Sequence, residues 1–167
     1  MGSEELNAQL VKRIDDAYAM EQNVLHILDG MIETTEDAEI KKDLEHHRSE
    51  TEQHCERMLQ RLEAHDASPS AVKEAGGILG AFMKGVVDMA RSERAGRNAR
   101  DGFATEHMEI ASYELLERVA QRAGDDGTAE AARLNRKDEE AMAQKISARW
   151  GKYADLSLKE AGVPLQG

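Results

Sequence analysis

The sequence predicts an all-α protein, a four-helix bundle in which a helical crossover joins two antiparallel helical hairpins. Three observations predict it. The 167 residues are rich in helix-forming Ala, Glu, Leu, Arg and Met, and aromatic residues, at 4%, are too few for an all-β domain. Apolar residues recur every three or four positions in four long stretches. Short turns separate the stretches within each pair, and a longer connection separates the two pairs.

The first hairpin is expected from two helices, about residues 4–31 and about residues 36–65. Gly30 interrupts the apolar stripe near the end of the first helix. Thr35 is the expected N-cap of the second helix, because two acidic residues follow it and the helix dipole favours acidic side chains in a first turn. The second helix is expected to end before Pro69, since proline suits the first position of a new helix.

The connection between the hairpins, about residues 69–91, has an apolar pattern that four glycines interrupt. Because glycine weakens a helix, this pattern predicts a broken or closely packed helical crossover. The second hairpin is expected from helices at about residues 95–123 and 128–150. The stretch Gly124–Gly127 between them predicts a tight turn.

One domain is expected over residues 1–167, with the bundle at about 4–150 and a short C-terminal extension at 151–167, because no low-complexity tract or linker divides the chain. A net charge of −11 disfavours nucleic acid and anionic lipid as partners. No apolar run approaches the roughly 20 residues of a membrane span, and the N-terminus is not typical of a signal peptide. With Cys55 as the single cysteine, these features favour a cytoplasmic location.

The most informative feature is a set of polar residues that interrupt the apolar stripes near the middle of all four helices. Helix by helix, these residues are Glu21; His47, Glu50 and His54; Glu106 and Glu109; and Glu139. A single Glu on a stripe is more often an edge residue that reaches solvent, but interruptions in all four helices favour a shared site. The middles of antiparallel helices lie in one layer, so these side chains are expected to converge inside the bundle.

Several carboxylates in an apolar layer are costly, since each buried unpaired charge costs on the order of several kcal/mol. Either their pKa values rise or cations neutralise them. Divalent metal ions that carboxylates bridge would do so, and His ligands favour iron, manganese or zinc over calcium. The tyrosines Tyr18 and Tyr113 are candidate catalytic residues that could donate hydrogen bonds to the carboxylates or carry electrons, although plain packing explains them equally well.

At these residues the chain resembles the YciE/YciF-type ferritin-like proteins, a bacterial stress-associated family of the rubrerythrin and ferritin-like superfamily. The matching stretches are DDAYAMEQNVL, HHRSETEQH, ATEHMEIASYELL and DEEAMAQKI, which together span residues 15–146. The resemblance implies a ferritin-like fold, a dinuclear metal centre and a homodimer. Carried over by position, the ligand candidates are the carboxylates of Glu21, Glu50, Glu106, Glu109 and Glu139 and the imidazole of His54.

The chain departs from the Glu-x-x-His pattern of ferritin-like helices in two places. Gln53 stands three residues after Glu50, and Met142 stands three residues after Glu139. The fourth helix therefore offers one ligand rather than two. His47, about one turn before Glu50, could compensate, so the imidazole ligand is either His47 or His54.

These observations give a leading hypothesis and an alternative. The leading one is a ferritin-like di-metal carboxylate protein, with iron or manganese and with zinc as a further candidate. Its activity would be of the di-iron oxidase or peroxidase type, the oxidation of iron or the removal of peroxide or oxygen species under stress. The alternative is a metal-free or single-metal helical module that dimerises through the glycine-rich crossover. A weaker hypothesis concerns Leu156–Lys159, which resembles peptides that dock ferritin-like cargo into encapsulin shells.

Overall fold

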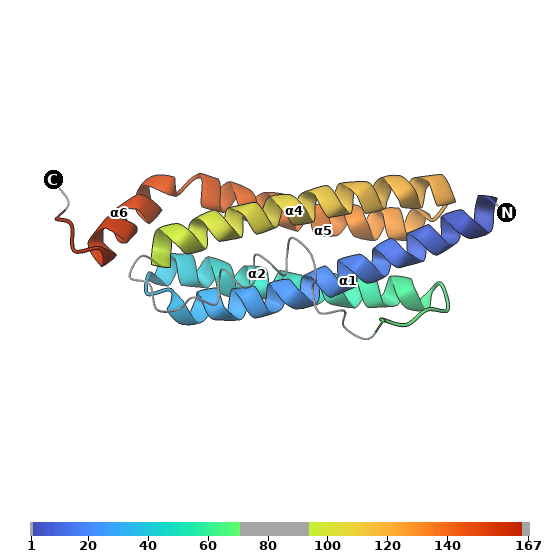
Figure 1. Cartoon of the computed structure of the whole chain (residues 1–167), viewed down its shortest axis with the longest axis horizontal. Helices are drawn as coiled ribbons and strands as arrows, with labels where there is room; N and C mark the ends of the chain where they lie inside the picture. Colours follow the sequence, from blue (N-terminus) through green and yellow to red (C-terminus); the bar gives the residue numbers. More distant parts are fainter. Residues whose placement is uncertain (1, 71–93, 165–167) are drawn as a thin grey trace.

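The structure, a computed structural model, describes residues 2–70 and 94–164. In these ranges the chain forms α-helices and no β-strand (Figure 1). The helices are α1 (Gly2–Thr34), α2 (Ala38–Glu63), α4 (Arg94–Ala123), α5 (Asp126–Ser147) and α6 (Trp150–Glu160). The expected crossover at 69–91 falls almost wholly outside the described residues. Within those residues, no helix is long and apolar enough to cross a membrane.

The four long helices form two antiparallel hairpins that pack side by side (Figure 1). One hairpin is α1 with α2, and the other is α4 with α5. The hairpins meet where α1 packs on α4 and α2 packs on α5. The short helix α6 lies at the end of the bundle where α4 begins, and packs against α4 (Figure 1). This architecture confirms the predicted all-α bundle of two helical hairpins.

The turn between α1 and α2 differs from the prediction. Gly30 does not end α1, which continues to Thr34. The N-cap of α2 is Asp37 rather than Thr35, because the Asp37 carboxylate accepts hydrogen bonds from two backbone N–H groups of the first turn. The Thr35 hydroxyl instead donates to the backbone oxygen of Met31, at 2.6 Å. The expectation for Thr35 was therefore wrong, since this threonine closes α1 and does not open α2.

The predicted turn between α4 and α5 is present and is held from outside. Gly124 has a φ of +71°, a backbone conformation that favours glycine. Asp125 caps α5, which begins two residues earlier than predicted, and the carboxylate also pairs with Arg61 and His65 near the end of α2. The turn of one hairpin is thus bonded to the neighbouring hairpin.

Two apolar clusters fill the bundle, one toward each end. One cluster contains Leu10, Ile14, Met58, Leu62, Leu116 and Ala132. The other contains Val24, Leu28, Leu44, Ala99, Met142 and Ile146. In each of the four helices the sequence passes from one cluster to the other across the polar residues singled out above. The polar residues therefore form a layer between two apolar regions.

Candidate metal centre

Six of the seven predicted metal ligands lie inside this layer. Glu21, His47, His54, Glu109 and Glu139 have no exposed surface, and Glu106 is 2% exposed. Glu50 differs, since 21% of its side chain is exposed at the edge of the layer. The four helices thus bring four carboxylates and two imidazoles together in the interior.

The first group of potential ligands is formed by Glu21 of α1, His54 of α2 and Glu139 of α5. The Nδ1 atom of His54 lies 2.8 Å from Glu139 Oε1 and 3.4 Å from Glu21 Oε1. One atom from each residue lies within 4.8 Å of the others. Three donor atoms at such separations could share one metal ion.

The second group is formed by His47 of α2, Glu106 of α4 and, again, Glu139 of α5. The Nε2 atom of His47 lies 3.2 Å from Glu139 Oε2 and 3.3 Å from Glu106 Oε2. Glu139 therefore belongs to both groups, with Oε1 facing His54 and Oε2 facing His47. Each oxygen of Glu139 could therefore offer a ligand atom to a different group.

The geometry of α2 explains why both histidines face the interior. His47 and His54 are seven residues apart, which in an α-helix returns a side chain to almost the same direction two turns along. Glu50 lies between them but is rotated toward the edge of the layer. There its carboxylate lies 3.1 Å from His47 Nδ1 and 3.1 Å from Nε2 of the exposed His46. Glu50 thus contacts the outer side of the His47 ring and joins neither group.

His54 has a corresponding carboxylate behind it. Its Nε2 atom lies 3.2 Å from Oδ2 of Asp138. Imidazoles that bind metals commonly donate their second N–H to a carboxylate, which fixes the ring orientation. Asp138 occupies this position behind His54, and Glu50 occupies it behind His47. Asp138 was not among the predicted site residues. The only sequence signal for Asp138 is that it adjoins Glu139.

Many polar atoms of the layer have no hydrogen-bond partner within the described part of the chain. They are Glu21 Oε2, Glu106 Oε2, both carboxylate oxygens of Glu109 and of Glu139, His47 Nε2 and His54 Nδ1. The short contacts that His47 Nε2 and His54 Nδ1 make with Glu21, Glu106 and Glu139 are not aligned as hydrogen bonds. A buried polar atom without a partner costs about 1–3 kcal/mol, and a charged one costs more. The orphaned atoms all belong to metal-ligand types, so the residues present fit divalent cations.

The pKa values of the buried carboxyl groups in the layer are strongly shifted. Burial raises the pKa of Glu21, and burial together with neighbouring carboxylates raises the pKa of Glu109 well above its ordinary range. Burial raises the pKa of Glu106 to about 8, although His47 opposes the shift. Burial alone would also raise the pKa of Glu139, but contacts with His47 and His54 outweigh it and lower the pKa to about 2.

In the two buried histidines, burial and the neighbouring carboxylates also act on the pKa in opposite directions, and the carboxylates prevail. Burial alone would lower the pKa of His54, but Glu139 and Glu21 raise it to about 10. His47 is likewise raised well above its ordinary pKa, against burial, by Glu106, Glu139 and Glu50. Without a metal, these opposite pKa shifts favour the ionised form of Glu139 and the protonated forms of His47 and His54. Because metal ligands must lose their protons, cation binding would release protons from this layer.

The two candidate tyrosines occupy different environments. Tyr113 is fully buried, and its hydroxyl donates to Glu21 Oε1 and accepts from Nδ2 of Asn135, the latter at 2.9 Å. Tyr18 is only partly buried and packs against one of the apolar clusters. Tyr113 is thus in direct contact with a potential ligand. Asn135, which donates to the Tyr113 hydroxyl from α5, was not among the predicted site residues.

Comparisons with known proteins agree with this architecture. A family model described as "Domain of unknown function (DUF892)" matches residues 5–157. A protein of known structure from Xanthomonas campestris pv. campestris is 26% identical, with a TM-score of 0.80 over 95% of this chain and 99% of that one. The stress protein YciF of E. coli is 19% identical, with a TM-score of 0.77 over 90% and 97% of the two chains.

A more distant match shows the same fold. Dps from Thermosynechococcus elongatus is 15% identical, with a TM-score of 0.72 over 89% of this chain and 94% of that one. The matches confirm the predicted resemblance to YciE/YciF-type proteins and the ferritin-like fold class.

Proposed function

Since this chain belongs to the family described as Domain of unknown function (DUF892), we propose that it is a ferritin-like di-metal carboxylate protein. The observation that carries the proposal is the position of Glu139, whose two oxygens face two different groups of buried ligand atoms. One ion would be held by Glu21, His54 and Glu139, and the other by His47, Glu106 and Glu139. Glu109, buried with both oxygens unpartnered, supplies a further carboxylate to the same layer.

The mixture of ligands favours particular metals. Carboxylates together with one imidazole for each ion suit iron and manganese, and zinc also accepts such a set. Bound iron or manganese would supply one-electron chemistry toward oxygen or peroxide. We therefore propose oxidation of ferrous iron or removal of peroxide under stress as the activity.

The residues of the chain would have separate roles in this activity. Glu50 and Asp138 hold the orientation of His47 and His54 from behind. Tyr113 donates a hydrogen bond to Glu21, a potential ligand, which makes it the candidate catalytic tyrosine. The apolar clusters on both sides exclude bulk water and so strengthen every electrostatic interaction in the layer.

The other hypotheses concern partners. The metal-free module relies on the glycine-rich crossover, which lies outside the described residues, so homodimer formation stays a prediction. Leu156 and Leu158 of the suggested shell-docking peptide are part of α6, where Leu156 packs against an apolar cluster and Leu158 is 43% exposed. Leu158 is the more exposed of the two, and docking also stays a prediction.

A comparison of metals tests the proposed activity. The chain would be stripped with a chelator and loaded with iron, manganese or zinc, and peroxide consumption would be followed for each form. The iron or manganese form is expected to consume peroxide faster than the same amount of free metal, and the zinc form is expected to be inactive because zinc has no redox chemistry. Equal rates for loaded protein and free metal would exclude peroxide removal as the activity.

A further inference from the structure

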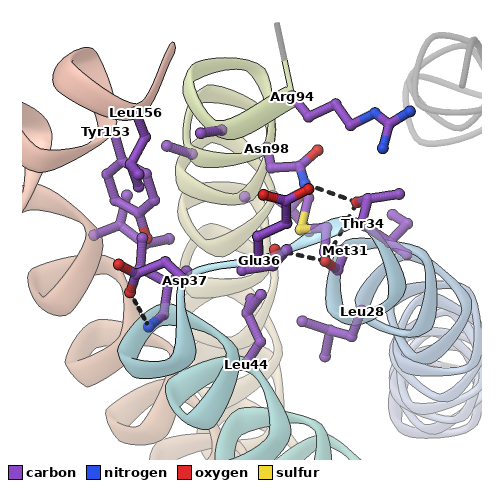
Figure 2. Close-up of a pocket in the computed structure, with 18 of the residues that line it drawn as sticks. Leu28, Met31, Thr34, Glu36, Asp37, Leu44, Arg94, Asn98, Tyr153 and Leu156 are labelled. Atoms are coloured by element: carbon purple, nitrogen blue, oxygen red, sulfur yellow. Dashed lines mark hydrogen bonds between the residues drawn. The ribbon is translucent and has the colours of Figure 1, made fainter. Parts of the chain in front are cut away.

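The described residues enclose a cavity of about 380 Å³ at the end of the bundle that carries α6 (Figure 2). Side chains from α1, α2, α4, α5 and α6 line it. Most of the wall is apolar and belongs to one of the two clusters, including Leu28, Met31, Leu44, Ile146, Tyr153 and Leu156. Small-molecule sites in proteins are typically pockets of 300–1,000 Å³ with mainly apolar walls, so this cavity is large enough for a short-chain ligand.

The cavity reaches the candidate metal centre. Thr105 and Glu106 of α4 are part of its lining, and Glu106 belongs to the second group of potential ligands. The Oε2 atom of Glu106 is one of the buried atoms that have no partner among the described residues. A molecule in the cavity would therefore extend from the end of the bundle toward a ligand of the proposed metal site.

Two small residues keep space open along α4. Ala99 and Gly102 both line the cavity, about two turns and one turn before Glu106, respectively. A Cβ atom placed on Gly102 would lie 3.4 Å from Ile146 Cδ1, so a methyl group would fit and a larger side chain would enter the cavity. Bulkier residues at these two positions would fill the space that leads to Glu106.

Polar groups gather where the cavity meets the outer end of the bundle. Asn98 donates to the Thr34 hydroxyl at 3.1 Å (Figure 2). The Glu160 carboxylate accepts from the backbone N–H groups of Arg94 and Ala95 at the start of α4. Lys159 adds a cation to this rim. An apolar interior with a polar rim is complementary to a molecule that has an apolar chain and a polar end.

We propose that the cavity binds a short alkyl chain with a polar end group, the chain directed inward toward Glu106 and the end group at the rim. The inference goes beyond the proposed function, because it adds a ligand site next to the metal centre that neither ferrous iron nor peroxide would need. Binding itself rests only on the cavity, since burying an apolar chain against apolar walls is favourable whether or not a metal is present.

The test uses decan-1-ol as the probe and the fluorescence of Trp150 as the signal. Trp150 is the only tryptophan, and its ring lies 6.2 Å from the ring of the cavity residue Tyr153. Titration of the metal-stripped chain with decan-1-ol is expected to give a saturable change, whereas ethanol, which has the hydroxyl without the long chain, is expected to give none. A missing response to decan-1-ol, or an equal response to ethanol, would overturn the proposal.

Two substitutions to leucine on the same helix localise the binding. Ala99→Leu fills the cavity and is expected to weaken decan-1-ol binding about tenfold or more. Ala104→Leu adds the same side chain at an exposed position of α4 and is expected to leave the affinity unchanged. Gly102→Ala adds one methyl group that the neighbours tolerate, and a smaller loss of affinity is expected even if Ala99→Leu does not fold. Unchanged affinity in both cavity variants would place the probe elsewhere and refute the inference.

The metal content of the same proteins separates this inference from the proposed function. A wild-type chain that binds two metal ions but no decan-1-ol would refute the cavity site alone. A wild-type chain that binds decan-1-ol with the expected variant pattern but takes up no metal would refute the metal centre alone.

Discussion

The Glu50 carboxylate contacts Nδ1 of His47, the ring nitrogen on the side away from the two groups of potential ligands, and Glu50 belongs to neither group. The Nδ1 atom of His47 lies 3.1 Å from Glu50 Oε2, while Nε2 faces the interior. The histidine is fully buried, and Glu50 remains partly exposed. In the proposed function, His47 would therefore bind a metal ion directly and Glu50 would orient its ring.

This assignment predicts the effect of Glu50→Gln. The variant keeps the shape of the side chain but loses the charge that orients His47, so metal affinity is expected to fall about 10–100-fold without loss of the site. Isothermal titration with manganese measures the affinity. Glu56→Gln, a change at an exposed position of the same helix, is the control. Complete loss of one ion in Glu50→Gln would show instead that Glu50 is a ligand.

Removal of the Tyr113 hydroxyl should affect stability. In Tyr113→Phe, Glu21 loses a donor and Asn135 loses an acceptor inside the layer. The free energy of unfolding is expected to fall by about 1–3 kcal/mol, measured by urea denaturation of the metal-free chain. Tyr18→Phe, at a partly buried position against an apolar cluster, is expected to change it by less than about 0.5 kcal/mol. Equal losses would contradict the distinction between the two tyrosines.

Metal removal should lower thermal stability. An ion that binds only the folded chain adds about 2.7 kcal/mol at a concentration one hundred times its Kd. Calorimetry of manganese-loaded protein is therefore expected to show a higher melting temperature than the same protein with a chelator. A melting temperature that neither manganese nor the chelator changes would favour the metal-free module.

The cap of α5 predicts a pH dependence remote from the metal centre. Burial alone would raise the pKa of Asp125, but bonds from Thr128, His65 and Arg61 hold it well below its ordinary value of 3.8. Because the folded pKa is the lower one, this stabilisation is complete above about pH 4 and is lost as the pH falls through the folded pKa.

Asp125→Asn tests this dependence, because asparagine still caps a helix but carries no charge. Its free energy of unfolding at pH 7 is expected to be lower than that of the wild type by about 1 kcal/mol or more. Urea denaturation at pH 7 and at pH 3 should show this deficit shrinking at the lower pH. A deficit that is constant or larger at pH 3 would contradict the assignment.

The bundle could be predicted because each helix carries its own apolar stripe. The polar layer could also be predicted, since Glu21 and Glu139 interrupt those stripes at mid-helix and an antiparallel bundle brings mid-helix positions together. The burial of both His47 and His54 could have been predicted from the same periodicity. Seven residues return a side chain to within about 20° of its direction, so both histidines share one face.

Other features depend on neighbouring helices and could not be predicted from the stripes. Glu50 lies about 60° around α2 from His47, close enough to the interior to resemble a ligand and far enough to face its edge. Asp138 reaches His54 only because α5 packs against α2. The choice of Asp37 over Thr35 as a cap likewise depends on local backbone geometry, because both residue types are good caps.

The number of metal ions bound to Glu139→Gln tests the account most directly. After loading with manganese and removal of excess metal, elemental analysis of the wild type is expected to find two ions per chain, one for each group of ligands. Glu140→Gln, a change at the exposed neighbouring position, should retain both ions. Glu139→Gln should lose most of both, because its two oxygens serve both groups. Two ions in Glu139→Gln, or none in the wild type, would contradict the shared site.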